Sequence, residues 1–558
     1  MKKVLTLIAF LLPVMAMAQL SGLTVNVSAP GQLSDLLPDM LRPALRQLKV
    51  CGPLNGDDLL LLKTMASEPA GENISEPALI GIDLSEAQIK GSTAVLSNHD
   101  DMLPEGLFMN CKTLQSVALP KAVKAISKNC FSGCRSLANV LMPDSLTLID
   151  ENAFRDCQSL TAISLPPTLK RIKAHAFGAC RSLKEIEVPR SVSQIDDGAF
   201  FKCTSLASVR LDCDIQHIAN SLFAVCTSLR SIMLPPSVTS IGNDAFRRCV
   251  QLEQIALPDS LPLLGNNVFE GCAKLPVITL SHTVRLGRNA FKGCVMLTTV
   301  RIDGPLSQLD NEIFSGCTNL CHVTLPASVK SIGVRTFYNC KSLQGFNMPE
   351  ALTTIGDHAF EGCASLRAIR IPGLVRKMGT DVFENCLTLD SVFFSGAIER
   401  LGSDVFRYCH SLRFILFPEK LKSIGDNCFK ECALLDSIPL PATVTTIGDN
   451  AFESCTSLHT MIVPAACTSI GSAAFRECSN LQHVELPASL KKIGGNTFTK
   501  CSALRDILLL CPLPPDITHS TFKGLNTEEC LFIVPKGTLT RYRKHKSWSK
   551  MSQISEQD

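Results

Sequence analysis

A hydrophobic pattern with a period of 23 residues runs through most of this 558-residue chain. Each copy begins with a phenylalanine, followed three residues later by a cysteine and six residues later by a leucine. The first of 18 copies starts at Phe108 and the last at Phe498, and a nineteenth phenylalanine, Phe522, has no cysteine after it. A fixed period of this length predicts a solenoid, in which each copy is one coil stacked on the preceding coil.

Within a copy, the apolar positions predict two short strands and one turn. The segment L-x-x-I-x-L ends in alternating apolar and polar residues, which indicates a strand with one buried face. Proline follows this strand in 13 copies and ends it. A second apolar pair comes next, and the glycines that often follow it, such as Gly242, Gly356 and Gly448, are predicted to turn the chain with positive φ. The A-F-x-x-C segment then has the spacing of a helical turn with its apolar side inward.

A single coil cannot fold alone. About six buried apolar side chains contribute about 10–15 kcal/mol, while ordering the backbone costs roughly 1–2 kcal/mol per residue. Stacked coils share their core and pair their strands. We therefore expect a parallel sheet that runs the length of the array.

The repeat also resembles a known family. The copy from Leu234 to Ile255 reads L-P-P-S-V-T-S-I-G-N-D-A-F-R-R-C-V-Q-L-E-Q-I, which is similar to the BspA-like class of bacterial leucine-rich repeats in its period, phenylalanine, cysteine and proline. The resemblance covers residues 104–510. It implies an α/β solenoid of about 18 coils, with a parallel concave sheet of L-x-x-I-x-L strands and short helical turns and strands on the other sides.

The two ends of the array are expected to be capped, because a terminal coil otherwise exposes its core. We assign residues 19–103 to an N-terminal cap with degenerate first repeats, in which the segments from Leu45 and Leu79 have the form of sheet strands. Residues 55–66 are predicted to form a helix, and residues 30–48 a helix interrupted by prolines. Residues 511–558 are assigned to a C-terminal cap with a last strand at residues 531–534, and Trp548 is expected to seal the last coil.

The first residues have the features of a secretory signal peptide, assigned to residues 1–18. Lys2 and Lys3 precede an apolar stretch, and the sequence Ala-Met-Ala precedes the expected cleavage. No later stretch approaches the ~20 apolar residues of a membrane helix. We expect a secreted or cell-surface protein, with the periplasm as the alternative. The net charge of +3 does not favour nucleic acid as a partner.

The cysteines are expected to be mostly reduced and buried. Those of the repeat occupy equivalent sites with parallel side chains, so pairing would break the equivalence of neighbours, and cysteine is a good small hydrophobe. A Cys511–Cys530 disulfide is the open alternative in the C-terminal cap. A single file of thiols offers no tetrahedral metal site, and no catalytic or cofactor-binding motif occurs. We therefore predict neither an enzyme nor a cofactor.

The outward positions of the sheet lie eight and ten residues after each phenylalanine. They are partly polar in early coils, as at Ser164, Glu185 and Arg210, whereas apolar residues occur on them in four successive coils from the thirteenth onward. An exposed apolar patch flanked by charge is a candidate partner site. The predicted partner-binding residues are Phe393, Phe414, Leu416, Pro439 and Ile462, with Arg370 beside them.

Two functions remain open. The first is an adhesin-like protein that recognises a macromolecule on its concave sheet, and the family resemblance implies adhesion to host matrix proteins or to other bacteria. The second is a periplasmic or surface scaffold that recognises glycan or cell-envelope components. The outward positions offer no Trp or Tyr, which disfavours glycan. The basic tail from Arg541 to Lys546 is interpreted as a solvated helix face, and the oligomeric state is not predicted.

Overall fold

The computed structural model describes residues 22–67, 79–91, 100–259, 261–283, 285–396 and 398–557. The signal peptide assigned to residues 1–18 lies outside these ranges. The chain divides into two compact units, residues 1–258 and 259–558, which are described separately.

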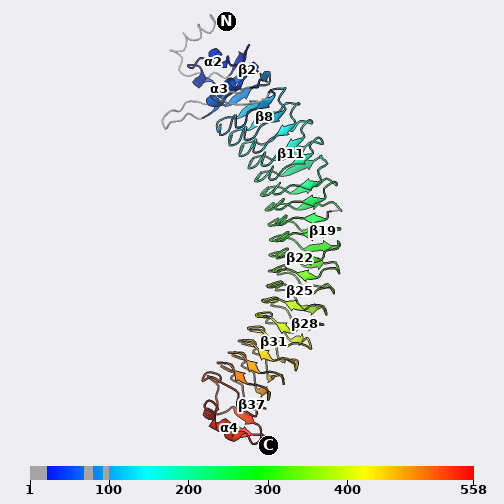
Figure 1. Cartoon of the computed structure of the whole chain (residues 1–558), viewed down its shortest axis with the longest axis vertical. Helices are drawn as coiled ribbons and strands as arrows, with labels where there is room; N and C mark the ends of the chain where they lie inside the picture. Colours follow the sequence, from blue (N-terminus) through cyan, green and yellow to red (C-terminus); the bar gives the residue numbers. More distant parts are fainter. Residues whose placement is uncertain are drawn as a thin grey trace. The chain divides into compact units, whose positions relative to one another are not determined.

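Unit 1 is a stack of coils that carries two parallel ladders (Figure 1). The longer strands lie in the L-x-x-I-x-L segments and in the segments before Phe108. They are β1 (Leu23–Asn26), β2 (Gln47–Leu54), β3 (Gly81–Asp83), β6 (Ser116–Ala118), β8 (Asn139–Leu141), β11 (Glu185–Val188), β13 (Ser208–Leu211), β15 (Ser231–Met233) and β17 (Gln254–Ala256), while β4 (Ala87–Ile89) pairs with β2. The two-residue strands of the second ladder are β5 (Met102–Leu103), β7 (Ala125–Ile126), β9 (Leu148–Ile149), β10 (Arg171–Ile172), β12 (Gln194–Ile195), β14 (His217–Ile218) and β16 (Ser240–Ile241).

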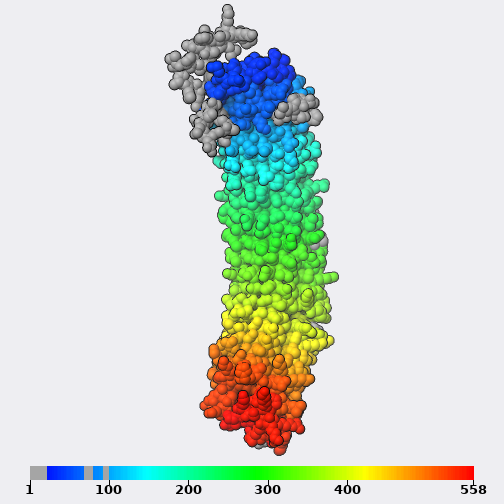
Figure 2. Space-filling model, turned by 60° about the vertical axis from the view of Figure 1, so that its left-hand side comes forward, coloured from blue at the N-terminus to red at the C-terminus, as the bar shows by residue number. Residues whose placement is uncertain are grey.

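Unit 2 repeats this arrangement. Its longer strands are β19 (Val277–Leu280), β21 (Thr299–Ile302), β23 (His322–Thr324), β26 (Ala368–Ile371), β28 (Ser391–Phe394), β30 (Phe414–Leu416), β33 (Thr460–Ile462), β35 (His483–Leu486), β37 (Asp506–Leu509), β38 (Leu531–Val534) and β39 (Ile554–Glu556). Its two-residue strands are β18 (Leu263–Leu264), β20 (Arg285–Leu286), β22 (Gln308–Leu309), β24 (Ser331–Ile332), β25 (Thr354–Ile355), β27 (Lys377–Met378), β29 (Arg400–Leu401), β31 (Ser423–Ile424), β32 (Thr446–Ile447), β34 (Ser469–Ile470) and β36 (Lys492–Ile493). In Figure 2 the coils of unit 2 follow one another in sequence order as bands from green to red.

Helices are few in the described residues. Unit 1 has α2 (Leu33–Leu36), α3 (Gly56–Ala66) and the 3-10 turn η1 (Arg42–Ala44), and unit 2 has α4 (Leu539–Lys544) and η2 (Trp548–Lys550). The predicted helix at residues 55–66 is confirmed, and Asn55 and Asp58 cap it reciprocally. The predicted helix across residues 30–48 is reduced to α2 and η1.

The file of phenylalanines forms the core of both units. In unit 1, Phe154 and Phe177 stack with ring centroids 5.4 Å apart, and in unit 2 Phe429 and Phe452 do so at 5.3 Å. The repeat phenylalanines from Phe108 to Phe498 are fully buried. This confirms the solenoid and its inward side chains.

The A-F-x-x-C segment is a stack of tight turns and not a helix. The Phe154 amide donates to the carbonyl of Ala176 in the next coil, and the Cys157 amide donates back to the Phe154 carbonyl. Each turn places residues in the left-handed region two positions before and after the phenylalanine, as at Asn152 and Asp156. The backbone groups of these turns therefore form a third hydrogen-bonded ladder along the stack.

The sheet of longer strands is interrupted, which corrects the expectation of one continuous sheet. In unit 1 it stops after β8 and resumes at β11, and in unit 2 it stops after β23 and after β30. Residues 437–440, between β30 and β33, are not a strand. Pro439 lies within this segment and Pro441 follows it, and neither has an amide hydrogen to donate to a ladder.

Candidate functional site

The predicted partner-binding residues lie on the outer face of the sheet in unit 2. Alternation along β28 places Val392 and Phe394 in the core, at 0% and 4% exposed, and Phe393 outside, at 38% exposed. Phe414, Leu416 and Ile462 are exposed as well. Since a buried strand position faces the core, the intervening residue must face solvent.

Strand register brings these residues together. Arg370 in β26 is paired with Phe393 in β28, and Phe393 is paired with Leu416 in β30. The Phe393 and Phe414 rings lie 5.5 Å apart with a 44° tilt between their planes. The sheet thus holds three exposed apolar side chains as one continuous surface.

Buried aromatic rings support this surface from below. Phe394 packs edge-on against Phe406 at 6.5 Å, and Phe417 packs against Phe429 at 6.0 Å. Both Phe406 and Phe429 belong to the stacked core file. The exposed residues therefore stand on a base of packed, buried aromatic rings.

A shallow groove of about 730 Å³ continues the apolar surface where the sheet is interrupted at Pro439. Its walls include Pro439, Ile462, Val463 and Pro464, and Glu485 lies at its edge. Val463 and Pro464 were not predicted from the sequence. The sequence feature that could have indicated them is the Pro-Ala pair that follows the strand in two successive coils, at residues 464–465 and 487–488.

Charges lie at both ends of the apolar surface. The Arg370 Nε atom donates to Ser395 Oγ at 3.2 Å, and Glu485 is paired in register with Ile462. Among the described residues, neither Arg370 nor Glu485 forms an ion pair, whereas the nearby Arg413 lies 3.7 Å from Asp390. The two unpaired charges have opposite signs.

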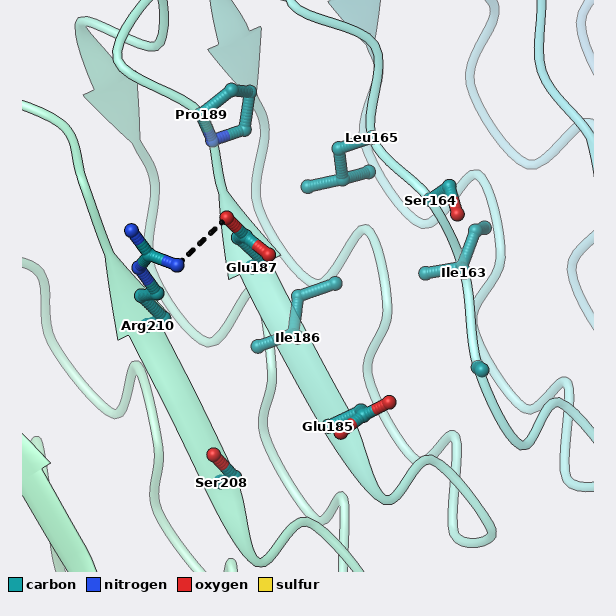
Figure 3. A pocket seen from close by; sticks show the side chains of 10 residues that line it. Ile163, Ser164, Leu165, Glu185, Ile186, Glu187, Pro189, Ser208 and Arg210 are labelled. Carbon is teal, nitrogen blue, oxygen red and sulfur yellow. Dashed lines mark ion pairs between the residues drawn. The ribbon is translucent and has the colours of Figure 1, made fainter.

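The corresponding face of unit 1 is polar. A groove of about 410 Å³ lies between residues 162–165 and β11, and Figure 3 shows Glu187 pointing toward Arg210, with Glu185 further along the same strand. Arg210 pairs with Glu187 at 3.3 Å and with Asp212 at 2.9 Å. Arg210 offsets only one of these two negative charges, and Glu185 forms no ion pair among the described residues.

Two exposed apolar residues of unit 1 were also missed. Leu141 and Met233 are 65% and 76% exposed at outward positions. Each stands alone, because the outward residues of the neighbouring coils include Ser164 and Arg210. Scattered exposed residues of this kind are normal on a protein surface.

The cysteines at the repeated position of each coil are buried in the described residues. The cysteines of the described residues are free in the structure, Cys511 and Cys530 included, and the reduced state of the repeat thiols stays a prediction. Burial raises the pKa of Cys203 to about 12 and that of Cys511 to about 11. The described residues contain no cluster of metal-binding side chains, and none of their helices has the length and apolar character needed to cross a membrane.

No curated protein sequence matches the chain. It is similar to a leucine-rich repeat protein from Bacteroides ovatus (23% identity, 87% of this chain and 94% of that chain, TM-score 0.31) and to a leucine-rich cell surface protein from Faecalibacterium prausnitzii (22%, 79% and 86%, TM-score 0.28). A leucine-rich repeat protein of T. pallidum is 27% identical over 37% of this chain and 76% of its own, with a TM-score of 0.24. These TM-scores are low, so the assignment rests on sequence.

The family model described as "BspA type Leucine rich repeat region (6 copies)" matches residues 101–229, 194–321, 284–413 and 399–529. These overlapping matches extend over most of the chain and follow the 23-residue period of the buried phenylalanines. The chain therefore belongs to the BspA-type leucine-rich repeat family.

Proposed function

We propose that this chain is a secreted or cell-surface protein that binds a macromolecular partner, most simply another protein, through the apolar surface of unit 2. One observation carries the proposal: Phe393, Phe414 and Leu416 are exposed, contiguous and held on a packed sheet. Aromatic residues surrounded by polar ones are the usual centre of a protein interface. A surface kept only for solubility would be polar at these positions.

The protein partner is favoured over a glycan by the residue types. Exposed phenylalanine and leucine side chains lie on the sheet at Phe393, Phe414 and Leu416, and most residues that line the groove have no hydrogen-bonding side chain. Sugars need hydrogen-bonding partners around an aromatic platform, because their hydroxyl groups lose water on binding. Adhesion to host matrix or bacterial surface proteins is the form of protein binding that we propose.

A capture experiment tests this function. The triple variant Phe393→Ser, Phe414→Ser and Leu416→Ser is compared with the wild type for capture of labelled host matrix and bacterial surface proteins. We expect the variant to lose capture and to keep its circular dichroism spectrum. The matched control is Leu141→Ser with Met233→Ser, which removes more exposed but isolated side chains and is expected to retain capture.

Unchanged capture by the triple variant would refute the proposed surface. Fractionation of the producing cells tests the export that we propose from the assigned signal peptide. Retention of the protein in the cytoplasm would refute a surface or secreted role.

A further inference from the structure

One exposed apolar residue per coil forms a line along the stack in unit 2. We call Phe393, Leu416, Pro439 and Ile462 the apolar file. They occupy the same position in four successive coils, and register pairing joins Phe393 to Leu416 while one groove contains Pro439 and Ile462. The neighbouring outward line is polar at Ser391, Ser437 and Thr460, with Phe414 as the exception. The apolar file is therefore a narrow strip parallel to the stack.

The spacing of the file discriminates between possible partner conformations. Successive coils in a parallel ladder lie about 4.8 Å apart, so the four residues span about 14 Å. An α-helix laid along the file advances about 5.4 Å per turn and covers this span in about three turns. In an extended chain, the side chains on one face repeat every ~6.7 Å. They therefore lose register with the coils after two repeats. A helix with apolar residues at i, i+4, i+7 and i+11 matches the file best.

The charges at the two ends add a second constraint. Arg370 lies one coil before Phe393, and Glu485 lies one coil after Ile462. Five coil spacings place them about 24 Å apart, which is the length of a helix of about 16 residues. Arg370 and Glu485 form no ion pair with any described residue, so both charges remain available to a partner. A helix that complements these two charges therefore needs one acidic end and one basic end.

We propose that the apolar file binds an amphipathic α-helix of a partner protein, laid along the stack, with an acidic side chain against Arg370 and a basic one against Glu485. This inference rests on the proposed function, because it assigns the partner of the same surface. It specifies that the bound segment is helical and that its two ends carry opposite charges. The helix can run in either direction, since only the positions of its end charges are specified.

Synthetic peptides of 16 residues test the inference, with affinity measured by fluorescence anisotropy. Three helical peptides share the apolar spacing i, i+4, i+7 and i+11 and differ in their end charges: one acidic and one basic end, two acidic ends, or two basic ends. A fourth keeps the end charges and apolar residues of the first, but two of its central residues are replaced by proline so that it cannot form a helix. We expect the wild type to prefer the first peptide by about five- to tenfold and to bind the fourth at least tenfold more weakly.

Single charge reversals should then change the preference. Glu485→Lys is expected to prefer the peptide with two acidic ends, and Arg370→Glu the peptide with two basic ends. Lys184→Glu, an exposed charge reversal in unit 1, is the control for net charge and should leave the preference unchanged. Equal affinity for all three helical peptides, or a preference that these variants do not alter, overturns the inference.

The two proposals fail differently. If the proline-containing peptide binds as tightly as the first, and this binding is lost in the Phe393→Ser, Phe414→Ser, Leu416→Ser variant, the helix is overturned and the apolar surface remains a binding site. The same holds if no peptide binds while the triple variant still loses capture of surface proteins. Retained capture by the triple variant would overturn the proposed function itself.

Discussion

At the scale of single residues, the repeated cysteine has a role beyond filling space. The Cys157 thiol donates to the Phe131 carbonyl of the preceding coil at 3.2 Å, and the same contact recurs at Cys340 and Phe314. Each Phe carbonyl thereby receives the cysteine amide of its own coil and the thiol of the next. Serine would bury a more polar group, and alanine would lose the donor. Cysteine is apolar enough to be buried and still donates a weak hydrogen bond.

We predict that the repeat thiols are unreactive in the folded protein. Burial raises the pKa of Cys203, Cys249 and Cys317 to about 12, so at pH 8 almost none is in the reactive thiolate form. Titration with a thiol reagent at pH 8 should label only half-exposed positions such as Cys51 and Cys321. In guanidinium chloride without reductant, nearly all 26 cysteines should react. Substantially fewer would indicate disulfides and contradict the packing described here.

At the scale of elements, the glycines that follow the second strand of each copy do not have the positive φ that the sequence predicted. Gly242, Gly356 and Gly448 do not have positive φ; the left-handed residues are Asp244, His358 and their equivalents two positions later. A Cβ on Gly356 would lie 2.7 Å from the Gly333 carbonyl carbon of the preceding coil. Glycine is needed because adjacent backbones approach closely. A single copy of the sequence cannot show this, since the contact lies between copies.

Gly356→Ala should therefore destabilise unit 2. We expect a loss of about 1–3 kcal/mol in the free energy of unfolding, because backbone atoms of two coils must move apart. Gly345→Ala is the matched control in the same coil, where no atom lies within 4 Å of the added Cβ. It should be neutral or stabilising by up to about 1 kcal/mol. Urea denaturation of both variants measures the difference, and equal effects would contradict the close-approach explanation.

The stacking of coils also brings the carboxyl groups of Glu361, Asp381 and Glu384 close together in the turns. Burial and the charge of Glu361 raise the pKa of Glu384 to about 7, although Arg407 lies 3.8 Å away. Because this pKa lies above the ordinary value of 4.5, the folded state binds more protons than the unfolded state between about pH 4.5 and 7. Stability should fall as the pH rises through this window.

We predict that Glu384→Gln stabilises the protein above pH 7 and has little effect near pH 4. The expected gain at pH 8 is about 1–2 kcal/mol, reduced from the full linkage value because the carboxyl group is partly solvated. Glu399→Gln is a control of opposite sign, since hydrogen bonding to Lys422 lowers the pKa of Glu399 and its removal should not stabilise. Urea titrations at pH 4 and pH 8 would contradict the prediction if Glu384→Gln gained nothing at pH 8.

At the scale of the whole molecule, the 23-residue period predicted which side chains face the core and which face solvent. It could not predict where single coils depart from the repeat. It placed Phe393 and Leu416 outside and Phe394 and Phe417 inside, because alternation along a strand fixes the side on which each residue lies. It did not predict the break in the sheet at residues 437–440, although Pro439 indicates it. It also did not predict the break at residues 162–165, where no proline lies within the segment.

The end of the array depends on the aromatic residues after the last regular coil. Trp548 is fully buried, packs edge-on against Phe522 at 5.7 Å and Phe532 at 6.0 Å, and donates to the Pro515 carbonyl at 2.8 Å. In a repeat protein each coil is stabilised mainly by its neighbours, so loss of the terminal contact should open the nearest coils first. We predict that Trp548→Ala costs about 3–5 kcal/mol locally.

Hydrogen exchange measures this effect along the chain. Amides of β37 and β38 should exchange faster in Trp548→Ala, whereas amides of β11 in unit 1 should be unaffected, because opening propagates from the end and weakens with each intact interface. The exposed neighbour Lys550 supplies the control, Lys550→Ala, which should leave exchange unchanged. Uniform acceleration in both units would mean that the stack unfolds as one cooperative body, and the description of Trp548 as a local seal would be wrong.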